Sequence, residues 1–277
     1  MPAGDALEAD LALLQDLALL KDVAREAGEL SLDWLRSGAR AWDKSANNPV
    51  TEADLAVNDL IARRLRGARP DYGWLSEETR DNPEDRTQEK VWVVDPIDGT
   101  KAFVKGDTGF CVSIARVDRG KPVLGVIYNP NFDELLHARV HGGAFLNDRP
   151  IRATTTDKLS CRMVGQPDVF AAADASRRWP GIQLISPMPN AVAWRMCLVA
   201  AGRWDAAVAI NPKNDWDLAA AVLLVHEAGG VATDRDGQQL AFNQTSVIQR
   251  GVVAAGAALH PLIMERLHNY PASQDLK

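Results

Sequence analysis

The chain has 277 residues, of which 46% are hydrophobic and 25% are charged, as in an ordinary globular protein. Its 31 Lys and Arg residues stand against 37 Asp and Glu residues, which gives a formal net charge of −6. These values exclude a disordered, fibrous or disulfide-scaffold protein. Without a run of Lys and Arg, the sequence also argues against a nucleic-acid polymer or an anionic membrane as partner.

Cysteine usage and the terminal segment indicate the compartment. The three cysteines are an odd number in apolar surroundings, so we expect buried thiols in a reducing cytosol. The segment MPAGDALEAD carries acids and does not resemble a signal peptide, and the apolar stretch 251–264 is too short to span a membrane. We therefore expect a cytoplasmic protein. A soft boundary near residue 153 divides it into an N-terminal half, 1–153, and a C-terminal half, 154–277.

The first half of the chain is predicted to contain two helices followed by strands. Apolar residues recur at three- and four-residue steps over 7–36, which predicts one long amphipathic helix. A second helix is predicted to start at Thr51, where Thr51 and Asp54 resemble a capping box, and to be ended by Gly67 and Pro70. Strands are predicted over 72–75, 91–94, 110–117, 122–128, 135–138 and 143–146, with a hairpin turn over 118–121.

The second half alternates between strands and helices. Strands are predicted over 163–166, 182–185 and 206–210, and helices over 191–201, 218–228 and 261–267. Helix pairs packed on two sheets predict a layered α/β architecture.

The strongest chemical signal is the segment VWVVDPIDGTKAF, which starts at residue 91. A hydrophobic strand runs into Asp95 and Asp98, and these two carboxylates converge if the chain turns sharply between them. Pro96 stiffens such a turn and Gly99 permits close approach of the backbone. Taken alone, this pattern is also typical of a surface turn rich in Asp and Gly.

Two further acidic segments change that interpretation. Glu77 and Glu78 end a predicted strand in WLSEET, and Asp217 opens a predicted helix in NDWDLAAAVLLVHEAGG. The ends of regular elements are where α/β folds build their sites. If Glu77, Asp95, Asp98 and Asp217 meet, repulsion prevents all four from staying ionised unaided. A hard cation such as Mg²⁺ or Mn²⁺ resolves this, because no His or Cys ligand stands nearby to favour Zn²⁺.

These segments resemble the motifs of the inositol monophosphatase superfamily of metal-dependent phosphatases. WLSEE matches its G/S-E-E segment, WVVDPIDGT its W-x-x-D-P-I/L-D-G-T motif, WDLAAAVLLVHEAGG its second signature and PVTEAD its V-T-x-x-D segment. The resemblance covers about residues 10–260 and implies a layered αβαβα sandwich.

The resemblance also implies which residues hold metal. Glu77, Asp95 and the main-chain carbonyl of Ile97 would hold one Mg²⁺, and Asp95, Asp98 and Asp217 would hold a second. A third, weaker ion near Glu77 would organise the attacking water, and Mn²⁺ could substitute for Mg²⁺. Lithium would inhibit by replacing one Mg²⁺.

Other roles follow from the same resemblance. Thr100 and Glu77 would orient and deprotonate the attacking water, with Asp54 supporting Thr100 from behind. The amides near Gly99 and Thr100, at a predicted helix start, would receive the phosphate oxygens. Two supporting residues complete the set: Glu78, and Lys44, which reads equally well as a solvated loop lysine.

Two positions favour a nucleotide as the phosphate ester. Residues 99–117 read GTKAFVKGDTGFCVSIARV. This is similar to the bacterial 3′(2′),5′-bisphosphate nucleotidases, which have G-T-K where inositol phosphatases have G-T-T, and Lys101 is the marker. Ala102 departs from that pattern, which usually has Glu. Arg195 stands where the nucleotidases commonly have a lysine, and it could pair bidentately with a second phosphate or lie as a surface arginine.

A third position argues against a polyol substrate. Inositol phosphatases place a glutamate seven residues before the aspartate of the second signature, and here that position is Ile210. An apolar side chain cannot accept a hydrogen bond from an inositol hydroxyl, so discrimination for a polyol would weaken.

The expected function is therefore Mg²⁺-dependent hydrolysis of the 3′-phosphate of adenosine 3′,5′-bisphosphate to AMP and phosphate. The resemblance places that reaction in sulfur metabolism. The alternatives are an inositol-1-phosphatase or broad sugar-phosphate phosphatase, a histidinol-phosphate phosphatase, and a non-catalytic binding homologue. We expect a monomer or a homodimer.

Overall fold

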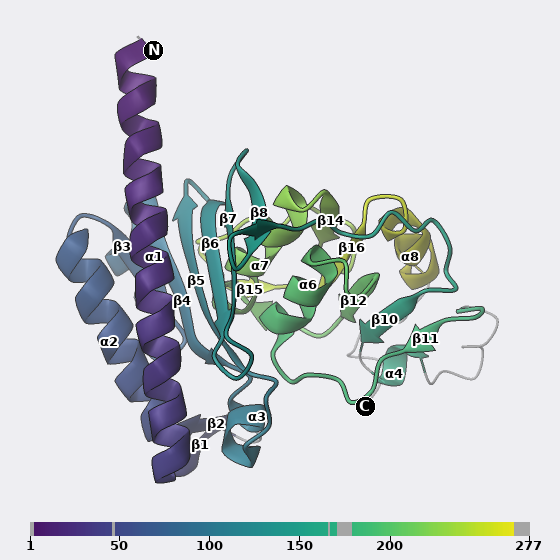
Figure 1. Ribbon diagram of the computed structural model, residues 1–277, viewed down its shortest axis with the longest axis horizontal. Helices are drawn as coiled ribbons and strands as arrows, with labels where there is room; N and C mark the ends of the chain where they lie inside the picture. The colour runs from purple at the N-terminus through teal and green to yellow at the C-terminus, as the bar shows by residue number, and fades with distance from the viewer. Residues whose placement is uncertain (1–2, 46–47, 166, 171–178, 269–277) are drawn as a thin grey trace.

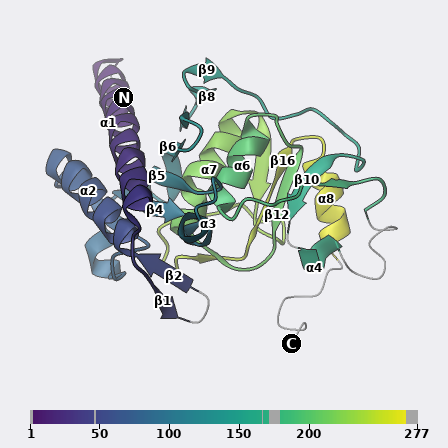
Figure 2. The ribbon, with the colours of Figure 1, turned by 60° about the horizontal axis from the view of Figure 1, so that its bottom comes forward.

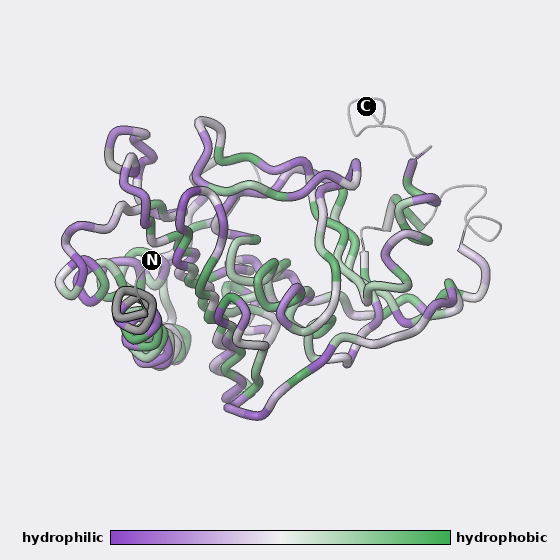
Figure 3. Tube along the Cα trace, turned by 90° about the horizontal axis from the view of Figure 1, so that it is seen from above, coloured by the Kyte–Doolittle hydropathy of each residue, from purple (hydrophilic) through white to green (hydrophobic). Residues whose placement is uncertain are grey.

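The computed structural model describes residues 3–45, 48–165, 167–170 and 179–268. Its elements stack as helix, sheet, helix, sheet, helix from one end of the long axis to the other, as Figure 1 shows. The arrangement confirms the predicted layered αβαβα sandwich. Figure 3 shows hydrophobic residues concentrated within the layers and hydrophilic ones along the outer connections.

The first layer consists of the two helices expected from the sequence. Helix α1 spans Ala3–Ser37, and its N-terminal part projects beyond the sheet that it covers. Helix α2 spans Glu52–Ala68, and the predicted capping box is present, since Thr51 accepts from the N–H of Asp54 and Asp54 accepts from the N–H of Thr51. The helix ends at Ala68, between Gly67 and Pro70, the two residues expected to end it, and Gly67 itself lies inside α2.

The second layer is a seven-stranded sheet whose strands lie in chain order. Strands β3 and β4 are parallel and every other neighbouring pair is antiparallel. The predicted hairpin is confirmed, because Arg119 and Gly120 form a two-residue turn with φ of 48° and 80°. The strands are β3 (Gly73–Ser76), β4 (Lys90–Asp98), β5 (Cys111–Asp118), β6 (Lys121–Asn129), β7 (Glu134–Arg139), β8 (Gly143–Leu146) and β9 (Arg149–Pro150), with the 3-10 turn η1 (Pro83–Arg86) before β4.

Strand β4 is buried on both faces. Trp92 and Val94 pack in the cluster under α1 and α2, whereas Val91 and Val93 pack in the cluster on the opposite face. Alternation between two apolar environments explains why the strand appears in the sequence as an unbroken hydrophobic run.

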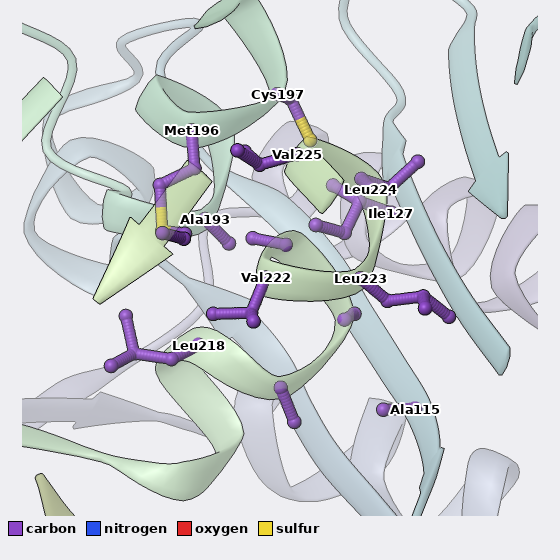
Figure 4. Close-up of a cluster of buried hydrophobic side chains, with 14 of the residues drawn as sticks. Ala115, Ile127, Ala193, Met196, Cys197, Leu218, Val222, Leu223, Leu224 and Val225 are labelled. Atoms are coloured by element: carbon purple, nitrogen blue, oxygen red, sulfur yellow. The ribbon is translucent and has the colours of Figure 1, made fainter. Parts of the chain in front are cut away.

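The third layer is formed by helices α6 (Val192–Ala200) and α7 (Asp215–Glu227), which lie between the two sheets. Figure 4 shows their side chains meeting Ala115 and Ile127 of the large sheet. Helix α7 approaches β6 so closely that a Cβ on Gly125 would lie 2.7 Å from the carbonyl oxygen of Ala220. Glycine is therefore required at position 125, and α7 is held firmly against the sheet.

The fourth and fifth layers come from the C-terminal half. The small sheet has the order β11-β10-β12-β16-β14, and α8 (His260–Leu267) covers its outer face. Its strands are β10 (Arg162–Gly165), β11 (Gln183–Leu184), β12 (Ala206–Ala209), β14 (Gly230–Thr233) and β16 (Val252–Gly256), with the short helix α4 (Pro167–Phe170) beside them. Gln166, the last residue of one predicted strand, lies outside the described residues.

Several short elements were not predicted. The hairpin of β1 (Ala41–Ser45) and β2 (Asn48–Thr51) lies beside helix α3 (Thr100–Lys105) at one edge of the molecule, as Figures 1 and 2 show. Strands β13 (Lys213–Asn214) and β15 (Ile248–Gln249) form a second small pair. Strands β14 and β16 were also missed.

Two further expectations from the sequence concern the state of the cysteines and the composition of the helices. The three cysteines are all buried and free, as predicted. Among the described residues, no helix combines the length and the hydropathy needed to cross a bilayer.

Candidate active site

Three carboxylates from distant parts of the chain meet at the edge of the large sheet. Glu77, Asp95 and Asp217 each offer an oxygen, and these oxygens all lie within 4.8 Å of one another. Asp98 lines the same pocket, which has a volume of about 290 Å³. All four acids singled out from the sequence are thus brought together.

The parallel pairing of β3 and β4 brings the first two acids side by side. Ser76 is in register with Val94, and the N–H of Glu77 donates to the carbonyl of Val94 at 3.2 Å. Glu77 and Asp95 therefore each follow one member of a paired set of residues and lie side by side. Strand β4 does not stop at residue 94 as predicted, but continues to Asp98 with a break in register between Asp95 and Asp98.

The other two acids are fixed by the middle helices. Asp98 accepts a hydrogen bond of 2.7 Å from the N–H of Ala193, in the first turn of α6. Asp217 lies in the first turn of α7, where it accepts from the N–H of Asn214 at 2.9 Å as part of a capping box. Helix α7 begins at Asp215, so Asp217 lies inside the helix and not at its first residue.

The four carboxylates repel one another, and two of them, Asp95 and Asp98, are buried. Burial is the main cause that raises the pKa of Asp95, and repulsion from Glu77, Asp98 and Asp217 raises it further. Burial and then Asp217 raise the pKa of Asp98 to about 7. Burial also raises the pKa of Asp217. An all-oxygen donor set that carries excess negative charge fits Mg²⁺ better than Zn²⁺, which prefers nitrogen and sulfur ligands.

This electrostatic conflict predicts a pH-dependent stabilisation by Mg²⁺. At a pH between its unfolded and folded pKa values, a carboxyl whose folded pKa is raised holds a proton in the folded state and has lost it in the unfolded state. The metal-free protein therefore loses unfolding free energy as the pH rises from the unfolded pKa of Asp98 to its folded value of about 7. Mg²⁺ should restore that loss, so its stabilising effect should be larger at about pH 8 than at about pH 5.

The measurement is urea unfolding with Mg²⁺ or with a chelator at each pH. The comparison must be made within one pH, because His137, His226 and His260 have pKa values lowered by burial and destabilise the fold as the pH falls. An equal effect of Mg²⁺ at both pH values would contradict the prediction.

Thr100 is held by groups from two other elements. Its hydroxyl lies 3.2 Å from Oδ1 of Asp54 and 3.2 Å from the carbonyl oxygen of Ile97. The second oxygen of Asp54 accepts from both the hydroxyl and the N–H of Thr51. The capping box of α2 thus fixes Asp54, and Asp54 in turn orients Thr100 at the floor of the pocket.

The turn that leads into α3 requires glycine. Gly99 has a φ of +95°, and a Cβ there would lie 3.0 Å from the carbonyl of Gly109. Gly99, Thr100 and Lys101 all line the pocket, and Lys101 has no hydrogen-bonded or ionic partner among the described residues.

Arg195 is buried in the wall of the same pocket, so its interpretation as a surface arginine is wrong. Its Nη2 donates to the carbonyl of Asn190 at 2.9 Å and its Nε to the carbonyl of Ala191 at 3.3 Å, while Nη1 lies 3.4 Å from Sδ of Met188. In the described parts of the chain no carboxylate lies within salt-bridge distance of this guanidinium. Burial lowers its pKa, and the fields of Asp98 and Asp217 oppose that shift.

Lys213 is a pocket cation that the sequence analysis missed. It is half-buried in β13, four residues before Asp217, and its Nζ donates to the carbonyl of Pro212 at 3.1 Å. Burial lowers its pKa, with Asp217 acting in the opposite direction. The only signal in the sequence is that this lysine lies in the short segment just before α7, close to Asp217.

Two other singled-out residues do not line the pocket, and a third, Lys44, has a side chain that lies outside the described part of the chain. Glu78 is half-buried next to Glu77, and its N–H donates to the hydroxyl of Ser76 at 3.4 Å. Ile210 packs in the apolar cluster between the small sheet and α8. Lys44 lies in β1, and its role stays a prediction.

Comparisons with known proteins agree on one family over most of the chain. A model described as the inositol monophosphatase family matches residues 13–272. An inositol-1-monophosphatase of Mesorhizobium japonicum is 36% identical over 233 residues, which cover 78% of this chain and 83% of that protein. The 3′(2′),5′-bisphosphate nucleotidase CysQ of Escherichia coli O157:H7 is 33% identical over 229 residues, covering 79% of this chain and 91% of that protein.

Solved structures agree with the fold. The extragenic suppressor protein suhB from Bartonella henselae superposes with a TM-score of 0.81 at 30% identity, covering 93% of this chain and 100% of that one. An IMPase from Thermotoga maritima gives a TM-score of 0.80 at 26% identity, covering 95% of this chain and 100% of that one. Because the relatives carry different substrate names, the comparisons leave the phosphate ester open.

Proposed function

The chain belongs to the inositol monophosphatase family, whose members are metal-dependent phosphatases of small phosphate esters, and from this premise we propose a specific substrate. We propose that the protein hydrolyses the 3′-phosphate of adenosine 3′,5′-bisphosphate, giving AMP and phosphate. The reaction would need Mg²⁺, in two or three ions, with Mn²⁺ as a substitute. A role in sulfur metabolism remains a prediction. So do inhibition by lithium and a cytoplasmic location.

One observation carries this proposal. Arg195 is buried in the wall of the acidic pocket with no carboxylate within salt-bridge distance in the described parts of the chain. The hydrogen bonds of the guanidinium go to main-chain carbonyls and to Sδ of Met188, and its pKa is lowered by burial, so a buried anionic ligand within reach would stabilise its charge further. Lys213 and Lys101 line the same pocket, so three cations face four carboxylates. A substrate with a second phosphate beside the one that is cleaved fits this distribution of charge.

The proposed mechanism assigns a task to each group of the chain. Glu77, Asp95, Asp98, Asp217 and the carbonyl of Ile97 would hold Mg²⁺. The bound ions would neutralise the phosphate and stabilise the leaving oxygen. Thr100, held by Asp54, would orient a water for in-line attack on phosphorus, and Glu77 would accept the proton of that water. Arg195 would bind the 5′-phosphate and keep the substrate in one orientation.

The proposal is tested by phosphate release from three esters under one Mg²⁺ concentration. These are adenosine 3′,5′-bisphosphate, inositol 1-phosphate and histidinol phosphate. We expect kcat/KM to be at least about 100-fold higher for the nucleotide, as one well-placed charged contact allows. A preference for inositol 1-phosphate would support the alternative indicated by the relative from Mesorhizobium japonicum. Activity on none of the three would favour a non-catalytic homologue.

A further inference from the structure

A second and larger cavity adjoins the acidic pocket. Its volume is about 630 Å³, within the range of sites that hold small organic ligands. Its walls come from α3 and the loop after it, from the turn between β6 and β7, from the segment 187–190 and from one side of α6. None of the four clustered carboxylates lines it.

The two cavities adjoin at two shared residues. Lys101 and Asn190 line both. Helix α6 also joins them, since Trp194 faces the larger cavity and the adjacent Arg195 faces the acidic pocket. Met188 lines the larger cavity and its Sδ touches the Arg195 guanidinium at 3.4 Å. A ligand that extends from the carboxylates past Lys101 and Asn190 would therefore enter the larger cavity.

The wall of the larger cavity is suited to a flat ring. Phe132 and Trp194 are nearly parallel, with an interplanar angle of 18° and ring centroids 6.2 Å apart. Phe132 remains 52% exposed although it is a large apolar side chain, so its ring offers a face to a ligand. Planar heterocycles stack on such rings, and an exposed phenylalanine at a site is stabilised by being covered.

Polar side chains also line this cavity. The side-chain amide of Asn190 has no hydrogen-bond partner among the described residues, and it can both donate and accept. Arg203 and Glu134 form a two-fold hydrogen-bonded ion pair, at 2.6 and 2.8 Å, that closes another part of the wall. An apolar stacking face with a few convergent polar groups is the usual construction of a site for a small heterocycle.

We propose that this cavity binds the heterocyclic base of a nucleoside bisphosphate, with the base stacked on Phe132 and its edge at Asn190. This proposal rests on the proposed function and extends it, because it assigns the part of the molecule that selects a nucleotide. The phosphate that reacts would lie at the carboxylates and the ribose beside Lys101. The chemistry that recognises the base is then stacking and amide hydrogen bonding, in addition to the contact of Arg195 with the second phosphate.

The test compares substrates with and without a base. KM is measured for adenosine 3′,5′-bisphosphate and for ribose 3,5-bisphosphate, in the wild type and in Phe132→Ala. We expect Phe132→Ala to raise KM about tenfold for the nucleotide and to leave it unchanged for the base-free ester, as is typical for one stacking contact. Phe132→Tyr should retain the wild-type values. Leu14→Ala, an exposed apolar residue on α1, is the control and should change neither.

A second arm separates this proposal from the proposed function. AMP and ribose 5-phosphate are compared as inhibitors of inositol 1-phosphate hydrolysis, which needs no activity on the nucleotide. Stronger inhibition by AMP in the wild type, lost in Phe132→Ala, supports a base site whichever ester is the substrate. Equal inhibition by the two compounds overturns the base site, even if adenosine 3′,5′-bisphosphate is the preferred substrate.

The oligomeric state provides a further check. Light scattering is measured for the wild type and for Phe132→Ala. If Phe132→Ala lowers the mass in solution and raises KM equally for both bisphosphates, the cavity is an interface between copies of the chain and the proposal is wrong. An unchanged mass with a selective change in KM supports it.

Discussion

Replacing Asp98 with asparagine is expected to lower kcat for Mg²⁺-dependent phosphate release by at least about 1000-fold, the scale seen when a charge-stabilising group is lost from an active site. The side chain of asparagine has nearly the same shape, and its carbonyl oxygen can still accept the 2.7 Å hydrogen bond from the N–H of Ala193. What the change removes is a negative charge among Glu77, Asp95 and Asp217. Activity should fall through lost affinity for Mg²⁺ and lost charge balance, and not through misfolding.

The same variant should be more stable than the wild type when no metal is present. Burial and the nearby Asp217 raise the pKa of Asp98 to about 7, so at higher pH its ionised form is held at a cost to folding. Thermal unfolding in a chelator at about pH 8 measures this. The matched control is Asp33→Asn, which changes an exposed acid on α1 and should alter neither property. A variant that is both inactive and less stable would contradict this account of the pocket.

Replacing Arg195 with glutamine is expected to act mainly on substrates with two phosphates. Adenosine 3′,5′-bisphosphate and adenosine 3′-monophosphate differ only in the phosphate that we assign to Arg195. Loss of one partner of a buried charge pair costs about 2 to 5 kcal/mol, so kcat/KM should fall about 100-fold for the bisphosphate. For the monophosphate we expect less than about a threefold change, which corresponds to under about 1 kcal/mol.

Two further variants guard against a purely structural effect. Arg195 also donates to the carbonyls of Asn190 and Ala191, so its loss could disturb the start of α6. Arg195→Lys keeps the charge without the forked geometry and should give an intermediate loss. Arg119→Gln changes an exposed arginine of the β5–β6 hairpin and should have no effect. An equal loss on both adenosine phosphates would show that Arg195 does not select the second phosphate.

The layered fold and the grouping of Asp95, Asp98 and Asp217 followed from local signals in the sequence. Asp95, Asp98 and Asp217 stand at the ends of strongly patterned elements, and such ends meet at sheet edges. The resemblance to a known family supplied what spacing alone could not, since Glu77 precedes Asp95 by a segment with no regular periodicity. The capping box of α2 was visible because it depends on only Thr51 and Asp54.

The missed elements are those whose patterns depend on contacts distant in the sequence. In β16, Val252 and Ala254 face the cluster around α7, whereas Val253 and Ala255 face α8. Because both faces are apolar, no polar alternation marks the strand, and it merged with the start of the next helix into one apolar stretch. Lys213 was missed because β13 is defined by its pairing with Gln249 of β15, which only the folded chain brings close.

The same is true of the larger cavity. Phe132, Met188 and Trp194 come from a turn, a loop and a helix, and nothing in their spacing relates them. Trp194 reads in the sequence as one of eight scattered tryptophans. It becomes part of a stacking surface only because the β6–β7 turn places the ring of Phe132 nearly parallel to its own ring.

The four acids come from segments that are far apart in the sequence, and a shared metal ion would link those segments. Asp95 and Asp98 belong to the large sheet and Glu77 directly follows one of its strands, whereas Asp217 belongs to a helix that lies between β12 and β14 of the small sheet in the sequence. An ion shared by these side chains would be a reversible crosslink between segments far apart in the sequence. In a chain whose cysteines are all buried and free, such a link would do the work of a disulfide and could be opened by a chelator alone.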